Sequence, residues 1–239
     1  MRTSGSNRET TEKAIRKAAV KTIAKHGFHA ASLRTVASEV GIQAGSLYNY
    51  INSKEEFLFR LLKEALERMI SEYHRRTKGV TDPIERLKAF IELHIELHTE
   101  QQEEVIIGNM ELRNLSPANY DVVTSLRDVY SGLLTGIIRD GAAQGLFQVK
   151  DPRIATFALL AMLTGICYWY RPRGRLKQHE LMKMHTDMAF ALLGTKTRLP
   201  SVSSRKEARL DGKSSRSKMR QSTGIRGQGM IKSKTRVSG

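Results

Sequence analysis

A helix-start signal that occurs three times limits the fold of this chain more than any other feature. At each occurrence an oxygen-bearing side chain directly precedes a proline, at Asp82-Pro83, Ser116-Pro117 and Asp151-Pro152. The oxygen can accept a hydrogen bond from a free backbone N–H of the first turn, and proline at the first helical position sacrifices no hydrogen bond. The signal therefore predicts helices over about 83–99, 117–144 and 152–171.

Glycines and one further capping pattern divide the rest of the chain. Apolar residues recur at helical spacing over 10–26, and a glycine follows directly. Ser53 and Glu56 have the spacing of a capping box, which predicts a long helix over about 53–78. Strand-like alternation and internal repeats are absent from the sequence. We predict an all-α fold of about nine helices, the remaining ones over 33–40, 44–51, 103–114 and 179–193.

Charge is distributed unevenly along the chain, whose net charge is +16. Residues 195–239 contain thirteen Lys and Arg against two acidic residues and have no aromatic residue, so we expect a disordered basic tail. Residues 1–52 contain eight Lys and Arg against three acidic residues, on a segment with a helical pattern. Residues 53–194 contain nineteen basic and nineteen acidic residues and are neutral. The basic first segment points to nucleic acid as a partner.

Two short predicted helices in this basic segment are joined by a turn that contains Gly41. Such a pair forms a helix-turn-helix, whose second helix lies in the DNA major groove. We therefore predict a flexible arm over 1–9 and a DNA-binding domain over 10–52. The apolar residues that would close its small core are Leu33, Val36, Ala37, Val40, Ile42 and Leu47.

Residues 32–56, SLRTVASEVGIQAGSLYNYINSKEE, resemble the signature of the TetR family of repressors, and the resemblance extends over about 10–62. In that family the third helix reads bases, an aromatic residue within it contacts phosphate, and the lysine that opens the fourth helix binds phosphate. The chain departs from the common pattern at Tyr50, where His is usual, and at Ile51, where Phe is usual. The resemblance implies DNA contacts by Ser32, Arg34, Thr35, Gln43, Ala44, Gly45, Ser46, Tyr48, Asn49, Tyr50 and Lys54.

The chemistry of three of these residues fits such roles independently. Asn49 can bond an adenine edge through both amide atoms, which discriminates against a wrong base by about 1–3 kcal/mol. Lys54 adds its charge to the positive end of the helix that it opens. Purely structural roles are the alternative to these DNA contacts: Tyr48 and Tyr50 can be core aromatics, and Asn49 can be a solvated helix residue.

The neutral segment 53–194 is expected to bind a ligand and to dimerise, because one helix-turn-helix alone binds too little DNA surface for tight specificity. The resemblance implies a homodimer built from the last two helices, on a palindromic double-stranded operator. Small and apolar residues suit such an interface, although packing within the monomer is the alternative. They are Ala155, Ala158, Ala161, Gly165, Leu181, Met184, Met188, Ala191 and Leu192.

The ligand is suggested by the segment YWYRPRGR at 168–175, which resembles a segment of TetR-type regulators that respond to fatty-acyl or other acyl-CoA thioesters. Its three arginines suit a pyrophosphate, and an aromatic ring there suits adenine. We expect a small-molecule effector, with acyl-CoA as the hypothesis. The predicted pocket residues, which ordinary core packing also explains, are Phe90, His94, Met110, Arg113, Leu126, Tyr130, Phe157, Met162, Trp169 and Arg171.

Other functional classes have little support in the sequence. His94 and His98 have zinc-ligand spacing but lack a third ligand, and no glycine-rich phosphate loop or nucleophile motif is present, so we expect no metal, no cofactor and no enzyme activity. The uncharged stretch 154–170 is short for a membrane span, so we predict a buried helix and no membrane partner. The single cysteine, Cys167, cannot form an internal disulfide, so we expect a cytoplasmic protein. The rival function is non-specific nucleic-acid binding driven by the basic tail.

Overall fold

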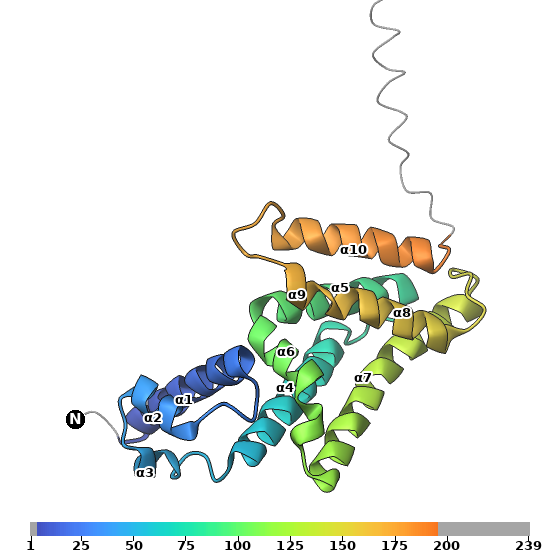
Figure 1. Cartoon of the computed structure of the whole chain (residues 1–239). Coiled ribbons are helices and arrows are strands. Elements are labelled where there is room, and N and C mark those ends of the chain that lie inside the picture. The colour runs from blue at the N-terminus through green and yellow to red at the C-terminus, as the bar shows by residue number, and fades with distance from the viewer. Residues whose placement is uncertain (1–3, 196–239) are drawn as a thin grey trace, which may run out of the picture. The chain divides into compact units, whose positions relative to one another are not determined.

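The computed structural model describes residues 4–195, and every regular element in that range is helical, which confirms the predicted all-α fold (Figure 1). The predicted basic tail lies outside the described residues, apart from Thr195. The elements are α1 (Ser4–His26), α2 (Leu33–Val40), α3 (Ala44–Leu47), α4 (Lys54–Arg76), α5 (Pro83–Glu100), α6 (Gln102–Met110), the 3₁₀ turn η1 (Leu112–Asn114), α7 (Pro117–Ala143), α8 (Pro152–Thr164), α9 (Ile166–Trp169) and α10 (Gln178–Leu192).

Two of the three predicted proline starts carry the expected side-chain cap. Asp82 accepts a hydrogen bond from the backbone N–H of Ile84 at 2.9 Å, and Asp151 caps α8 in the same way. The side-chain cap predicted for Ser116 is wrong. A tertiary contact replaces it, because Glu55 of α4 accepts the backbone N–H of Ser116 at 3.0 Å.

Four predicted boundaries also differ from the structure. The helix expected from residue 10 begins at Ser4, so the expected flexible arm over 1–9 is helical from Ser4 onward. The helix expected over 44–51 ends at Leu47, because the backbone N–H groups that follow bond carbonyl groups three residues earlier, as in a 3₁₀ turn, instead of four. Residues 103–114 form α6 and η1 instead of one helix. Residues 152–171 form α8 and α9, which are separated at Gly165, because glycine has a poor helix propensity.

Tertiary hydrogen bonds hold α9 after this break. The side-chain amide of Gln102 in α6 donates to the carbonyl oxygens of Cys167 and Tyr170, at 3.3 and 2.9 Å. The stretch Pro152–Trp169 is long and apolar enough to cross a membrane by length and composition, but only 33% of it is buried in the structure. The prediction of a simple buried helix is therefore only partly right, because one side of this stretch is exposed.

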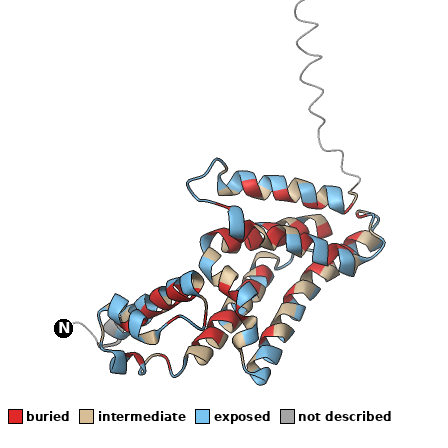
Figure 2. Ribbon diagram, viewed as in Figure 1, coloured by how far each residue is buried: buried red, intermediate tan, exposed pale blue. Residues whose placement is uncertain are grey.

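Two hydrophobic cores organise the described residues, and α4 contributes to both (Figure 2). In the first core, Leu58 and Leu61 of α4 pack with residues of α1, α2 and α3. In the second, Met69 and Tyr73 of α4 pack with α5, α7, α8 and α10. All six residues predicted to close the small helix-turn-helix core are in the first core or pack against it.

Two buried histidines lie beside the second core, where the ring of His94 stacks on that of Phe90. The rings of His94 and His98, one helical turn apart on α5, stack with their centroids 3.7 Å apart. Burial lowers the pKa of His98 from 6.5 to about 4, and burial together with the neighbouring His98 lowers the pKa of His94 well below its usual value. Both rings are therefore neutral near pH 7.

We expect the free energy of unfolding to fall as the pH is lowered from about 6.5 towards 4. In that window the unfolded chain binds protons on these histidines while the folded chain does not, and each pKa unit is worth about 1.4 kcal/mol. His98→Phe should flatten this pH dependence in urea unfolding, whereas His179→Gln, at an exposed position, should leave it unchanged. Equal pH slopes in all three proteins would contradict the prediction.

Two glycines of α7 provide a matched test of packing. A Cβ atom at Gly141 would overlap the ring of Phe147, whereas a Cβ at Gly136 would meet nothing within 4 Å. We expect Gly141→Ala to destabilise the fold by about 1–3 kcal/mol through overpacking. Gly136→Ala should be neutral or stabilise it by up to about 1 kcal/mol, through helix propensity. Thermal unfolding of both variants measures this difference, and equal effects would contradict it.

Candidate functional sites

The helix-turn-helix is held in shape by local contacts that its sequence specifies. Ser32 caps α2 by accepting the backbone N–H of Arg34 at 3.2 Å. Gly41 ends α2 with φ of 76°, a left-handed conformation that favours glycine. The backbone N–H of Ile42 then bonds the carbonyl of Ala37 at 3.0 Å, which turns the chain into α3.

One side of α3 is buried and the other is open. Leu47 has no exposed surface and anchors α3 to the first core, whereas Tyr48 is 57% exposed. Tyr48 is therefore not a core aromatic, while Tyr50 is half-buried with the guanidinium of Arg8 at 5.9 Å from its ring centre. The other predicted base-reading residues on and around α3 are exposed, namely Gln43, Ala44, Gly45, Ser46 and Asn49, as are Ser32, Arg34 and Thr35.

Lys54 has a structural contact that the sequence did not indicate. Its ammonium group donates to the carbonyl oxygens of His29 and Ala31, both at 3.1 Å, and lies 4.6 Å from the ring centre of Phe28. Lys54 thus ties the loop between α1 and α2 to the start of α4. Carbonyl groups on a distant loop leave no local sequence signal.

Ion pairs connect the helix-turn-helix to the helices behind it. Arg16 of α1 pairs with Glu64 of α4 at 2.6 Å and with Glu104 of α6 at 3.2 Å. Glu104 also lies 3.7 Å from Arg68 of α4. In addition, the buried side chain of Glu111 accepts the backbone N–H of Phe28 at 3.2 Å.

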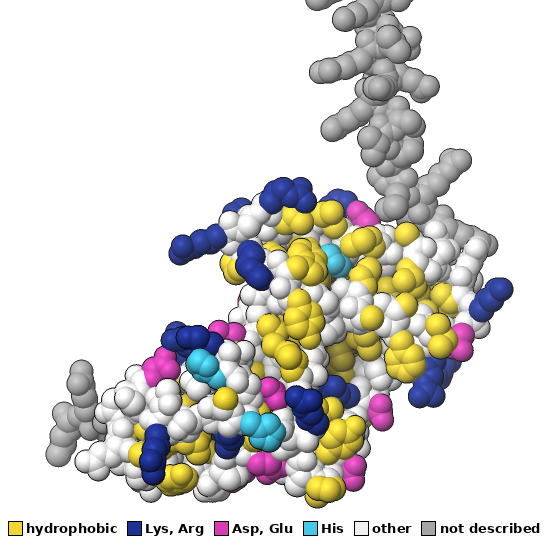
Figure 3. Space-filling model, viewed as in Figure 1, with side chains coloured by type: hydrophobic (Ala, Val, Ile, Leu, Met, Phe, Trp, Pro, Cys, Tyr) yellow, Lys and Arg dark blue, Asp and Glu magenta, His cyan; other side chains and the backbone are white. Residues whose placement is uncertain are grey.

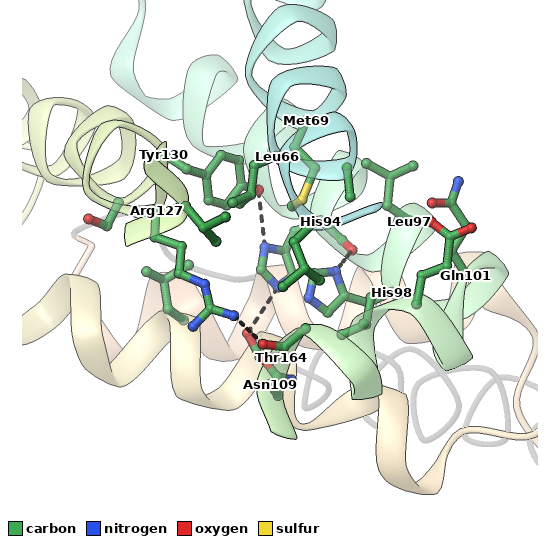
Figure 4. Close-up of a pocket in the computed structure, with 18 of the residues that line it drawn as sticks. Leu66, Met69, His94, Leu97, His98, Gln101, Asn109, Arg127, Tyr130 and Thr164 are labelled. Carbon is green, nitrogen blue, oxygen red and sulfur yellow. Dashed lines mark hydrogen bonds between the residues drawn. The ribbon is translucent and has the colours of Figure 1, made fainter. Parts of the chain in front are cut away.

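A cavity of about 330 Å³ lies among α4, α5, α6, α7 and α8 (Figure 4). Most of its wall surface is apolar, although the charged side chains of Arg68, Glu104, Arg127 and Asp128 also line it. The lining residues are Leu62, Ala65, Leu66, Arg68, Met69, His94, Leu97, His98, Gln101, Glu104, Val105, Gly108, Asn109, Val123, Arg127, Asp128, Tyr130, Ser131, Phe157, Leu160 and Thr164.

Three of the ten predicted pocket residues line this cavity: His94, Tyr130 and Phe157. Phe90 lies behind the wall, fully buried, with its ring stacked on that of Tyr130 at 4.8 Å. Six others are not lining residues: Met110, Arg113, Leu126, Met162, Trp169 and Arg171. Arg127 and Thr164 also line the cavity but have no signal in the sequence, since no spacing rule shows which helix face meets a cavity.

The aromatic and basic segment 168–175 lies beside α6, next to the cavity wall. The amide of Asn109, a lining residue, donates to the hydroxyl oxygen of Tyr168 at 3.4 Å. Arg171 donates to the carbonyl oxygens of Tyr168 and Tyr170, while Arg173 and Arg175 are exposed and have no ion pair within residues 4–195. The segment thus contains exposed positive charge, and Tyr168 at its start contacts a residue of the cavity wall.

A second exposed feature is an apolar surface on α8 and α10, where hydrophobic side chains gather in Figure 3. Ile154 and Phe157 are 63% and 50% exposed on α8. Of the residues predicted for a dimer interface, Leu181 and Ala155 are buried within the subunit. The exposed ones are Ala158, Ala161, Met184, Met188, Ala191 and Leu192, whereas Gly165 is half-buried.

Within residues 4–195, no three His, Cys, Asp or Glu side chains gather in a group that could hold a metal ion. His94 and His98 lie side by side, but each ring is engaged: His98 Nδ1 donates to the carbonyl of His94 at 2.8 Å, and both ring nitrogens of His94 have side-chain partners.

Comparison with known proteins gives two family matches and several relatives. The family described as bacterial regulatory proteins, tetR family, matches residues 15–61, and the tetracyclin repressor-like C-terminal domain matches residues 80–193. The HTH-type transcriptional repressor KstR2 of Mycolicibacterium smegmatis is 25% identical over 160 residues, which cover 66% of this chain and 78% of that protein. The fatty acid metabolism regulator protein of Bacillus subtilis is 27% identical over 134 residues, covering 56% and 68%.

A solved structure of AibR in complex with isovaleryl coenzyme A and operator DNA has the same fold, with a TM-score of 0.69 and 26% sequence identity. The match covers 75% of this chain and 98% of AibR. The relatives are transcriptional regulators, and the two matched families account for both the helix-turn-helix and the helical bundle behind it. The chain therefore belongs to the TetR family and is a DNA-binding transcriptional regulator.

Proposed function

We propose that this regulator is a homodimeric repressor that reads a palindromic operator with α3 and is released by a small molecule bound in the cavity. The observation that carries the proposal is the two-sided character of α3. Buried Leu47 fixes the helix to the core, while Gln43, Ser46 and Asn49 are exposed on the other side. A short helix held in this way can present its polar side chains to base edges in the major groove.

The exposed apolar surface of α8 and α10 supports the dimer. Ile154 and Phe157 of α8 and Met184 and Met188 of α10 are all exposed, and exposed apolar patches mark interaction sites. Two copies joined there would carry two helix-turn-helix domains, called the reading heads below, which a two-fold symmetric operator requires. The same proposal places the protein in the cytoplasm with its DNA and assigns it no catalysis.

An acyl-CoA is the effector class that the geometry supports best. The cavity has apolar walls suited to an acyl chain, and Asn109 connects its wall to Tyr168 in the basic segment. Arg173 and Arg175 there are free to bind phosphate groups. Among the relatives, AibR is described in complex with isovaleryl coenzyme A, and the Bacillus subtilis protein as a fatty acid metabolism regulator.

Release from DNA follows from a shift between two dimer states. A ligand that prefers the state with wrongly spaced reading heads lowers DNA affinity by about 5–150-fold for a typical coupling of 1–3 kcal/mol. Two connections lead from the cavity to the head. One is α4, which belongs to both cores, and the other is Glu104, which lines the cavity and pairs with Arg16.

Asn49→Ala should weaken binding to the operator by about 5–150-fold, because a bidentate contact to adenine is worth about 1–3 kcal/mol. It should leave binding to random DNA unchanged. Ser38→Ala, at an exposed position on α2 outside the predicted contact set, is the matched control. The operator is obtained by selecting bound duplexes from a random pool, where a homodimer should enrich a palindrome. Sequence-selective binding that survives Asn49→Ala intact would contradict the assigned reading residue.

The alternative function, non-specific nucleic-acid binding through the tail 195–239, is distinguished by deleting that segment. If the protein is a repressor, operator selectivity should persist after the deletion. A protein that binds nucleic acid non-specifically through its tail would lose most of its affinity for any DNA.

The double variant Arg173→Gln, Arg175→Gln should weaken binding of acyl-CoA about tenfold or more, because it removes two charge-assisted contacts to phosphate. Lys150→Gln, an exposed charge in the turn between α7 and α8, is the control and should bind like the wild type. Calorimetric titration measures both affinities. Equal affinity in the double variant and the wild type would remove the role assigned to the basic segment.

A further inference from the structure

Three side chains from three helices form a hydrogen-bonded row along the cavity wall (Figure 4). The Nδ1 atom of His94 lies 3.1 Å from the hydroxyl oxygen of Tyr130, and its Nε2 atom lies 3.3 Å from the hydroxyl oxygen of Thr164. His94 comes from α5, Tyr130 from α7 and Thr164 from α8. All three line the cavity.

The direction of these hydrogen bonds follows from the burial of Tyr130 and His94. Burial raises the pKa of Tyr130 well above its usual value and lowers the pKa of His94 well below its own, so the phenol keeps its proton and the imidazole is neutral. A neutral imidazole has one N–H. If that N–H were on Nδ1, the buried Tyr130 hydroxyl would have no acceptor, since His94 is its one hydrogen-bond partner within residues 4–195.

Leaving a buried donor unpaired is costly, so the opposite arrangement is favoured. The Tyr130 hydroxyl donates to Nδ1 of His94, and Nε2 of His94 donates to the hydroxyl oxygen of Thr164. The hydroxyl proton of Thr164 is then left without a partner in this row.

Thr164 does not use that proton within its own helix. Thr99, Thr124 and Thr156 each donate to the carbonyl oxygen four residues earlier in their helices. Thr164 has no such bond in the described part of the chain, and its half-buried side chain lines the cavity. Its hydroxyl group is therefore free to donate into the cavity.

Arg127 adds a second donor to the same side of the cavity. In Figure 4 its guanidinium group points towards the side on which Thr164 lies. One of its nitrogens donates to the backbone carbonyl of Gly108 at 2.6 Å, and no carboxylate of residues 4–195 forms an ion pair with it. A guanidinium has five N–H donors, so several remain for a ligand.

We propose that the Thr164 hydroxyl and the Arg127 guanidinium bind the carbonyl oxygen of a carboxyl-derived group, either a thioester or a free carboxylate, on the effector. This inference rests on the proposed function in that it takes the cavity as the effector site. The apolar remainder of the ligand would lie against Leu66, Met69 and Leu160. The row of Tyr130 and His94 serves to fix the orientation of the Thr164 hydroxyl.

Such a site selects its ligand by chemistry as well as by size. A hydrocarbon without the oxygen would leave the two donors facing an apolar group after water has been displaced, which is costly. A ligand with a carbonyl oxygen satisfies both donors, and a carboxylate also neutralises the guanidinium.

The experiment compares matched ligands on the full-length protein by calorimetric titration. Saturated acyl-CoAs from butyryl-CoA to palmitoyl-CoA are titrated first. The chain length that binds best is then tested as the S-alkyl-CoA thioether, which lacks the carbonyl oxygen, and as the free carboxylate. Operator release by each ligand is measured separately, by fluorescence anisotropy of labelled DNA.

The variants are Thr164→Val, which is close in shape and lacks the hydroxyl, and Arg127→Gln. Ser71→Ala is the control, because Ser71 is exposed on α4 outside the cavity lining and its hydroxyl donates to the carbonyl of Arg68 at 3.1 Å. We expect Thr164→Val to weaken binding of the carbonyl ligand roughly tenfold, and Arg127→Gln by more. Thioether binding should be unchanged or stronger, because each variant removes a donor that the thioether leaves unpaired. Thermal unfolding without ligand checks that each variant is folded.

Equal losses for acyl-CoA and thioether, or no loss for either, would overturn the carbonyl site, as would the failure of every carbonyl ligand to bind. If only the free carboxylate binds, and does so in a manner sensitive to Thr164 and Arg127, the site stands and the acyl-CoA proposal fails. Carbonyl-dependent binding that does not release operator DNA supports the site and contradicts the proposed regulatory function.

Discussion

The packing of one helix into two hydrophobic cores is the constraint on which the rest of this structure depends. The first half of α4 places Leu58 and Leu61 in the core of the helix-turn-helix, and its second half places Met69 and Tyr73 in the core of the bundle. Because close-packed cores do not deform continuously and a helix is stiff, a displacement at one end of α4 has to be accommodated at the other. The reading head and the bundle are therefore mechanically connected.

Around that connection, α6 provides a second link of a different kind. Glu104 is part of the cavity wall and also pairs with Arg16 of α1, while Glu111, at the end of α6, accepts the backbone N–H of Phe28. Partly buried charge pairs are sensitive to the position of either partner, since removing one leaves the other uncompensated. In the proposed function, a ligand that shifts α6 would alter these contacts and the placement of α1 together.

The two proposed sites differ in how far the sequence predicts them. The DNA-reading residues lie within one continuous segment, where a cap at Ser32, a left-handed glycine at Gly41 and a buried Leu47 determine which side chains stay exposed. The cavity instead takes its walls from five helices. Phe90 has an apolar side chain on the correct helix but lies behind the wall, whereas Arg127 and Thr164 line it without any motif.

Local chemistry in the sequence was sufficient to determine the helical class of the fold, the helix-turn-helix with its family, and two of the three proline caps. These features depend on interactions between residues a few positions apart. Only the tertiary structure decided that Glu55 rather than the Ser116 side chain satisfies the start of α7, that the helix over 152–171 is interrupted at Gly165, and that Thr164 and Arg127 share a cavity. Those outcomes depend on which faces of distant helices meet, and hydrophobic periodicity does not specify the partner of a face.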